Sequence, residues 1–180
     1  NVVRTRIGSP YVIAGMQALL AQSSLPVAGF EANGGFLLGS PLPQHPDVLP
    51  LPTRDAVLPM LTLLQACKQS GSPLSALVAT APARYTVSDR LTAFASERSQ
   101  ALLARWAPEP ARMLDALGVQ ETYASSDLTD GLRVHCHSGN IVHIRPSGNA
   151  PELRAYIESA TLADAQALLQ QVMAALAQLS

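Results

Sequence analysis

Alternating apolar and polar residues mark the last third of the chain. Between residues 132 and 145 every second residue is apolar on either side of a Ser-Gly-Asn turn at 138–140. A period of two puts alternate side chains on opposite faces of a strand, so the segment predicts a β-hairpin. Its buried face would carry Leu132, Val134 and Cys136. A second alternating run at 153–157 predicts a neighbouring strand.

Apolar residues spaced by three or four indicate the helices. The first is predicted from Pro10 to Gln22, with Ser9 as its N-cap, because a serine hydroxyl can accept a main-chain N–H bond there. Further helices are predicted at 58–69, 74–79, 96–106, 109–117 and 162–179. The last begins with a capping box in which Thr161 faces Asp164.

Shorter elements fill the first half. Strands are predicted at 27–29 and 36–38, on either side of a glycine-rich turn, and a looser alternation predicts one at 85–94. Residues 41–52 hold five of the fourteen prolines. Because proline lacks the N–H group that pairs a strand with its neighbour, this segment is predicted to be a loop or a lid. The composition changes near residue 82, which divides the chain into predicted units 1–82 and 83–180. The class is mixed α and β with two small lobes.

Composition and charge exclude several function classes. The 180 residues are 48% hydrophobic and 14% charged, with twelve basic and thirteen acidic residues. This balance predicts neither a nucleic-acid partner nor an anionic membrane surface. No apolar run is long enough to span a bilayer. Cys67 and Cys136 lie far apart and predict free thiols in a reducing, cytoplasmic compartment. The chain starts with Asn1 instead of Met, which suggests a piece of something longer.

The loop between the last two predicted strands groups several hydrogen-bond donors. It carries the guanidinium of Arg145, the hydroxyl of Ser147, the amide of Asn149 and the approachable N–H of Gly148. Arg154 follows on the polar face of the next strand and can turn back towards the loop. A phosphate group favours this set of donors. The alternative is an ordinary connection with two solvated arginines.

A second candidate is Glu-Ala-Asn-Gly-Gly at 31–35. Glu31 and Asn33 are two residues apart, so in an extended segment both side chains can meet one ligand. A carboxylate beside an amide suits vicinal sugar hydroxyls. The alternative is a tight turn in which Asn33 and the glycines adopt positive φ.

Other conspicuous residues have simpler readings. A three-residue turn would place His135 opposite His143, with His137 on the same face, and these three imidazoles raise a zinc hypothesis. No cysteine or carboxylate joins them, so a solvated sheet face is favoured and no metal site is predicted. Asp127 and Asp130 are read as turn-formers. Tyr85 and Trp106 are read as core residues.

Four segments in order resemble one family closely. RTRIGSPYVI at 4–13, GFEANGG at 29–35, DGLRV at 130–134 and RPSGNAPELRAYIES at 145–159 are similar to the second half of the α-D-phosphohexomutases. The resemblance covers essentially the whole chain and implies that it starts inside the third of four domains. Domain three would have a mixed sheet with flanking helices. Domain four would have an antiparallel sheet packed with helices, similar to the TATA-box-binding protein.

The resemblance implies a role for each candidate residue. Glu31 and Asn33 would contact the sugar hydroxyls, with Arg6, Gly8 and Ser9 beside them. The substrate's non-reacting phosphate would be bound by Arg145, Ser147, Gly148, Asn149 and Arg154. Three positions depart from the common pattern, since Asn33 replaces a serine, Asn149 a threonine and Gly35 a histidine. These departures leave the sugar and any general acid or base open.

The implied activity is interconversion of hexose 1-phosphate and 6-phosphate, of mannose or glucose, through a phosphoserine enzyme and a bisphosphate intermediate. The phosphoserine and a Mg²⁺ ion would belong to the protein's own amino-terminal half, so this fragment would be inactive alone and would hold no metal and no catalytic residue. Its partners would be a phosphosugar and that other half. Two alternatives remain open, a phosphoglucosamine mutase and a non-catalytic phosphosugar-binding module.

Overall fold

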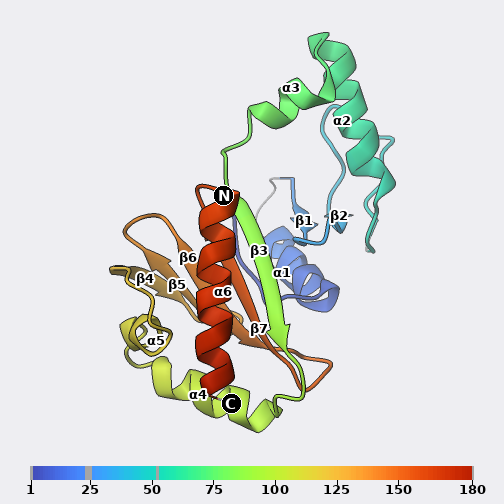
Figure 1. Ribbon diagram of the computed structural model, residues 1–180. Helices are drawn as coiled ribbons and strands as arrows, with labels where there is room; N and C mark the ends of the chain where they lie inside the picture. The colour runs from blue at the N-terminus through green and yellow to red at the C-terminus, as the bar shows by residue number, and fades with distance from the viewer. Residues whose placement is uncertain (1, 23–25, 52, 180) are drawn as a thin grey trace. The chain divides into compact units, whose positions relative to one another are not determined.

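The structure is a computed structural model, and it describes residues 2–22, 26–51 and 53–179. Contacts within the chain divide it into two units, Asn1–Pro82 and Ala83–Ser180. Figure 1 shows the helices and strands of both. Pro52, the last proline of the predicted loop, lies outside the described residues.

The first unit consists of helices around a small hairpin. Its elements are α1 (Ser9–Gln22), β1 (Ala28–Phe30), β2 (Phe36–Leu38), α2 (Val57–Ser70) and α3 (Leu74–Ala79). β1 and β2 pair antiparallel, with Gly29 opposite Leu37. The expected mixed sheet is therefore not found among the described residues. The glycine-rich turn closes the two strands into a hairpin, and the proline-rich segment that follows adds only isolated bridges.

The core of the first unit is small. Val12 and Met16 of α1 pack with Val27 and Leu37. α2 begins where the Asp55 carboxylate accepts the main-chain N–H groups of Val57 and Leu58, and Pro59 is tolerated because it lies in the first turn. α2 has no buried residue. Its exposed apolar side chains include Val57, Met60, Leu61, Leu63 and Leu64.

The second unit is a five-stranded antiparallel sheet with helices. Its elements are β3 (Tyr85–Leu91), α4 (Ser96–Trp106), α5 (Ala111–Ala116), β4 (Tyr123–Asp127), β5 (Leu132–Cys136), β6 (Ile141–Pro146), β7 (Leu153–Ser159) and α6 (Leu162–Gln178). The strand order is β3-β7-β6-β5-β4. The sequence did not indicate β4, because this edge strand is polar and shows no alternating burial.

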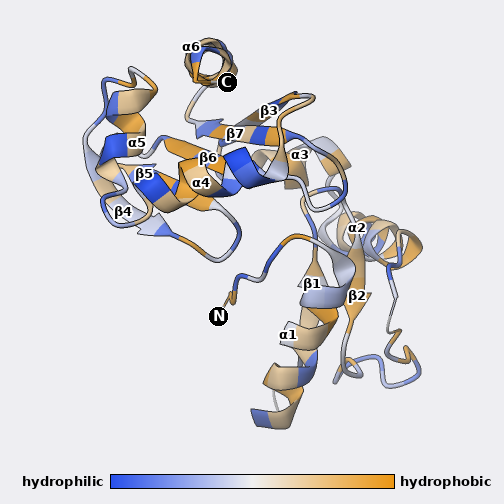
Figure 2. Ribbon diagram, turned by 90° about the horizontal axis from the view of Figure 1, so that it is seen from below, coloured by the Kyte–Doolittle hydropathy of each residue, from blue (hydrophilic) through white to orange (hydrophobic). Residues whose placement is uncertain are grey.

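One face of this sheet carries the core. Inward residues of the central strands, which include Leu132, Val134, Ile144, Leu153 and Ile157, pack against α6 and against the segment of α4 and α5. The helices contribute Trp106, Met113 and Leu176 to the same core. Figure 2 shows strongly apolar colour along β6, with α6 on one side of the sheet. Trp106 is buried as predicted, whereas Tyr85 is exposed, because it begins the edge strand β3. The opposite face is polar.

The predicted hairpin is present, but its register differs from the expected one. His135 is paired with Ile141, and His143 is paired with Arg133. The turn closes one residue earlier than predicted, since Cys136 donates its N–H to the carbonyl of Asn140 and Gly139 takes φ of +89°. The expected pairing of His135 with His143 is therefore wrong.

Local signals at the end of the chain hold. The Thr161 hydroxyl accepts the N–H of Asp164 at 3.1 Å, as the capping box requires. Cys67 and Cys136 are free thiols. Over the residues that the structure describes, no helix combines the length and apolar character that crossing a bilayer demands.

Candidate functional site

The predicted phosphate loop follows directly from a buried strand. Arg145 lies in β6, and the chain leaves the sheet after Pro146. The loop is closed by the Ser147 N–H, which donates to the carbonyl of Glu152 at 2.9 Å. Inside it, the Asn149 N–H donates to the Ser147 hydroxyl at 3.4 Å. The tip with Gly148 and Asn149 is exposed, so the loop presents its donors to solvent.

Arg145 is the most unusual residue of this loop. Its side chain is only 8% exposed, and one guanidinium nitrogen lies 3.2 Å from a carboxylate oxygen of Asp130. Its Nε is one of two buried side-chain nitrogens without a hydrogen-bond partner in the described part of the chain; Arg133 holds the other. Gly131 permits this packing, because a Cβ there would approach the Cβ of Arg145 to 2.6 Å, and its φ is +82°.

Asp130 is held from a second side. His143 Nε2 lies 2.6 Å from the main-chain oxygen of Asp130, and its ring stacks on Tyr156 at 5.5 Å between centroids. Burial lowers the pKa of His143, so the ring is neutral near pH 7. His143 and Arg145 are alternate residues of β6 and grip the same aspartate.

Arg154 lies beside Arg145. The two are directly opposite each other in the β6–β7 ladder. The Arg154 guanidinium donates twice to one oxygen of Glu152, at 2.9 and 3.2 Å. Hydrogen bonds to Glu152 and Tyr156 raise the pKa of Arg154, so it is fully charged. The structure therefore brings two predicted phosphate ligands together, each with its own carboxylate.

In the first unit, Glu31 is the centre of the predicted sugar loop. Its side chain is 8% exposed, accepts a hydrogen bond from the Ser9 hydroxyl at 3.3 Å and forms an ion pair with Arg54, whose Nε lies 3.4 Å away. Ser9 is thus the first residue of α1 and not its N-cap as predicted, because its hydroxyl points to Glu31. The carbonyl of Gly8 accepts the first helical N–H bonds instead.

Asn33 and Arg6, which were also predicted to bind the sugar, make other contacts. The Asn33 side-chain oxygen accepts the N–H of Gly35 at 3.0 Å, and Gly34 takes φ of +89°. The tight turn of the alternative is therefore present, but within 31–35 the positive φ falls on Gly34 alone, and Asn33 contributes its side-chain oxygen instead. Arg6 is exposed and lies over the Tyr11 ring at 5.9 Å. Ser9 and Glu31 are brought together, while the side chain of Asn33 serves its own turn.

Sequence reasoning missed several members of these clusters. Asp130 was read as a turn-former, and Arg54 and Glu152 were not singled out. The close approach of Gly35 to Arg54, where an added Cβ would come within 2.6 Å of Arg54 Cδ, is visible only in the structure.

The described residues form no cluster of metal-ligating side chains. In the ranges 2–22, 26–51 and 53–179, no three of the His, Cys, Asp and Glu side chains gather closely enough to hold an ion. Both clusters have the chemistry of binding sites. The cluster around Glu31 presents a buried carboxylate, and the cluster around Arg145 presents two guanidinium groups, a hydroxyl and an exposed loop tip.

Comparisons with known proteins agree on one family. Residues 1–85 match the model described as phosphoglucomutase/phosphomannomutase, alpha/beta/alpha domain III. Residues 96–175 match the model described as phosphoglucomutase/phosphomannomutase, C-terminal domain. Together they cover most of the chain and both units, and they confirm the expected fold class.

Individual relatives carry the same description. The chain is 44% identical over 175 residues to a phosphomannomutase of Salmonella muenchen and 44% identical over 177 residues to one of Sinorhizobium fredii. These alignments cover 96% and 98% of this chain, but 36% and 37% of the relatives. A solved phosphoglucomutase/phosphomannomutase family protein from Burkholderia thailandensis shares the fold, with a TM-score of 0.60 at 16% identity over 97% of this chain and 32% of its own.

The helical unit with its glycine-rich hairpin and the antiparallel sheet with its arginine-bearing loop are the two parts that the family models match. The chain belongs to the phosphoglucomutase/phosphomannomutase family. It corresponds to that family's third and C-terminal domains and spans about a third of the length of the curated relatives it matches.

Proposed function

We propose that the chain is the substrate-recognition part of a phosphohexomutase that interconverts hexose 1-phosphate and hexose 6-phosphate. The observation that carries the proposal is Arg145, whose buried Nε lacks a partner at the base of a loop with an exposed tip at Gly148 and Asn149. A buried unpaired donor costs about 1–3 kcal/mol, which a phosphate oxygen would recover. The relatives' name, phosphomannomutase, supports mannose phosphates over glucose phosphates.

In this proposal each cluster has its own task. Glu31, which already accepts from Ser9 and pairs with Arg54, would accept from sugar hydroxyls. Arg145, Arg154 and Ser147 would hold the phosphate that does not react. Phosphoryl transfer depends mainly on positioning and charge stabilisation, so tight binding of the unreactive phosphate would contribute much of the catalysis. The bisphosphate intermediate would reorient during the reaction, which requires a sugar site that accepts both orientations.

The reacting groups are assigned to another part of a longer protein. A phosphoserine there would donate the phosphoryl group, and Mg²⁺, when bound, would neutralise charge on the phosphoryl oxygens. Among the described residues, no three His, Cys, Asp or Glu side chains gather closely enough to hold such an ion. The proposed partner is accordingly the amino-terminal half that carries both.

Complementation tests the proposal. The purified chain is mixed with a phosphoserine-bearing amino-terminal half of a phosphomannomutase, and conversion of mannose 1-phosphate to mannose 6-phosphate is followed. We expect activity from the mixture, and at least a tenfold loss with Arg145→Ala, the scale of a charge-assisted contact. Arg112→Ala, an exposed arginine of α5, is the matched control. A mixture that binds but does not turn over would favour a non-catalytic module.

A further inference from the structure

Three arginines line up across neighbouring strands of the second unit. The register pairs Arg90 of β3 with Arg154 of β7, and Arg154 with Arg145 of β6. Directly paired residues of an antiparallel ladder project from the same face, so the three side chains leave the sheet next to one another. Arg90 lies between the two ranges matched by the family models, in a segment that neither covers.

One carboxylate already joins two of these arginines. Glu152 Oε1 lies 3.5 Å from Arg90 Nε, and Glu152 Oε2 lies 2.9 Å from a terminal nitrogen of Arg154. Glu152 is 14% exposed and Arg90 is 58% exposed. The two guanidinium groups are therefore held at the spacing of two oxygens of one oxyanion. The same spacing suits two oxygens of a phosphate.

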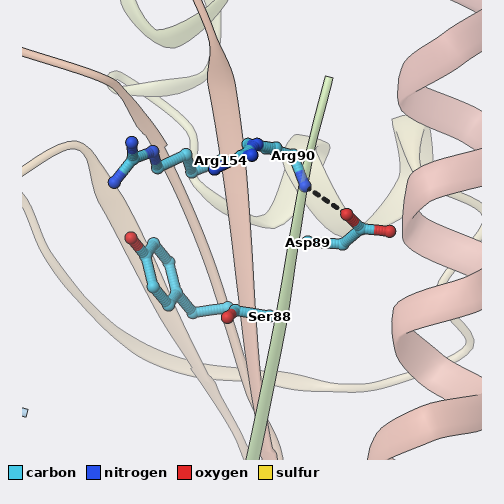
Figure 3. Close-up of a pocket in the computed structure, with 5 residues that line it drawn as sticks. Ser88, Asp89, Arg90 and Arg154 are labelled. Carbon is cyan, nitrogen blue, oxygen red and sulfur yellow. Dashed lines mark hydrogen bonds between the residues drawn. The ribbon is translucent and has the colours of Figure 1, made fainter. Parts of the chain in front are cut away.

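The charges of this row do not balance. Three arginines carry three positive charges, and among the residues that the structure describes the carboxylates paired with their guanidinium groups are those of Glu152 and Asp130. Asp89, the neighbour of Arg90, does not complete the balance. Its carboxylate turns towards α6 and accepts the main-chain N–H of Arg90 at 2.8 Å (Figure 3). One positive charge remains, on residues whose mutual repulsion an anion would relieve.

A hollow of about 310 Å³ lies against two of the arginines. It is lined by Ser88, Asp89, Arg90, Arg154 and Tyr156. Figure 3 shows the side chains of Arg90 and Arg154 reaching to the same side, away from α6. The hydroxyls of Ser88 and Tyr156 add further donors. A polar hollow lined by two arginines suits a charged group and not an apolar one.

We propose that Arg90 is a third guanidinium of the phosphate-binding site, so that a phosphate monoester dianion contacts Arg90 together with Arg145 and Arg154. This inference rests on the proposed function of the 145–154 segment. Glu152 keeps the guanidinium groups of Arg90 and Arg154 side by side before the ligand arrives. Arg90 thereby extends the site from the loop to the edge strand β3.

Phosphate titration of the isotope-labelled 180-residue chain tests the proposal. Inorganic phosphate and mannose 6-phosphate are added at constant ionic strength, and the arginine Nε–H signals are followed by NMR. We expect the Arg90 signal to shift with those of Arg145 and Arg154. We expect Arg90→Gln to weaken binding roughly fivefold, as for one charged contact at a partly exposed site. Arg90→Lys keeps the charge but loses the paired N–H donors of the guanidinium group. Its phosphate affinity should lie between those of the unmodified chain and Arg90→Gln.

The controls separate this inference from the proposed function. Arg112→Gln removes an exposed arginine paired with Glu109 and should leave the affinity unchanged. If Arg145→Ala abolishes binding while Arg90→Gln binds as the unmodified chain does, the proposed role of Arg90 is wrong. The assignment of the 145–151 loop to phosphate binding is then retained. If Arg145→Ala has no effect, the proposed function itself fails. Circular dichroism verifies the folds, and Arg90→Lys decides should Arg90→Gln not fold.

Discussion

His143 and Asp130 are joined by a contact of 2.6 Å between the ring Nε2 and the main-chain oxygen of Asp130. A carbonyl oxygen only accepts, so Nε2 carries the proton of the neutral ring. The carboxylate of the same aspartate contacts Arg145 at 3.2 Å. A buried ring outside the phosphate loop therefore anchors the residue that holds the loop's arginine.

This contact predicts a pH-dependent stability. Burial lowers the pKa of His143 from its usual 6.5, so the unfolded chain binds the proton more readily than the folded one. Stability is then fully present above the unfolded pKa and is lost as the pH falls through 6.5 towards the folded pKa. Urea unfolding at pH 7.5 and 5.5 measures this loss. His143→Gln, which cannot titrate, should show a smaller difference, and equal differences would contradict the prediction.

The affinity for phosphosugars should depend on Arg145. Arg145→Ala removes the buried guanidinium and should weaken binding of mannose 6-phosphate by about 1.5–3 kcal/mol, the value of a charge-assisted hydrogen bond. Titration calorimetry of the chain measures the dissociation constant. Arg112→Ala is the control, because that arginine is exposed and lies on α5. An unchanged constant for Arg145→Ala would refute the assignment of the loop.

Glu158 should stabilise the sheet in a second, lower pH range. Its oxygens lie 3.0 Å from Arg84 Nε and 3.2 Å from a terminal nitrogen of Arg133. Burial raises the pKa of Glu158, but hydrogen bonds from these arginines outweigh it and lower the pKa below 4.5. The contribution is present above pH 4.5 and is lost as the pH falls through the folded value.

Replacing this carboxylate tests the point. Glu158→Gln should cost about 1–2 kcal/mol of unfolding free energy at pH 7 and much less at pH 3. Asp115→Asn, at an exposed position of α5, should cost little at either pH. A penalty for Glu158→Gln that is the same at both pH values would show that the ion pairs are not its source.

Gly35 should control the contact between Arg54 and Glu31. An added Cβ would lie 2.6 Å from Arg54 Cδ and 3.1 Å from the Glu31 carboxylate. Arg54 is flexible and half exposed, so Gly35→Ala should displace it at a cost below about 1 kcal/mol. The Arg54 Nε–H signal in NMR reports the displacement, and thermal melting reports the cost. Gly148→Ala, where the new methyl meets nothing within 4 Å, should leave both unchanged.

The two thiols should differ in reactivity. Burial and, secondarily, the charge of Glu121 raise the pKa of Cys136 to about 11. Thiolates are the reactive form, so Cys136 should resist a disulfide reagent at pH 8 until the chain is unfolded. Cys67 is half-buried and should react first. In Cys67→Ser the fast phase should disappear, and its persistence would contradict the assignment.

Elements with strong local signals were predictable. α3 and α4 begin and end at the predicted residues, and Thr161 caps α6 as its spacing with Asp164 requires. Each rests on contacts within a few residues. β4 was not predictable, because a polar edge strand depends on its neighbour for pairing and not on its own pattern.

Some residues of the candidate site were predictable from the sequence, and their partners were not. Arg145 and Glu31 stand in motifs that the sequence displays directly. Their carboxylate and guanidinium partners, Asp130 and Arg54, are separated from them by fifteen residues or more along the chain. Such pairs form only when strands or helices bring distant segments together, and no local pattern records them.

The sequence by itself determined the family, the helices and strands other than β4, and the two loops that carry the candidate chemistry, because each depends on short-range spacing or on motifs in a fixed order. The tertiary structure alone decided the register of the hairpin, the burial of Arg145 and the row of Arg90, Arg154 and Arg145. The physical reason is that register and burial follow from packing between strands that are far apart in the chain, where a shift of one residue in the turn changes every cross-strand partner.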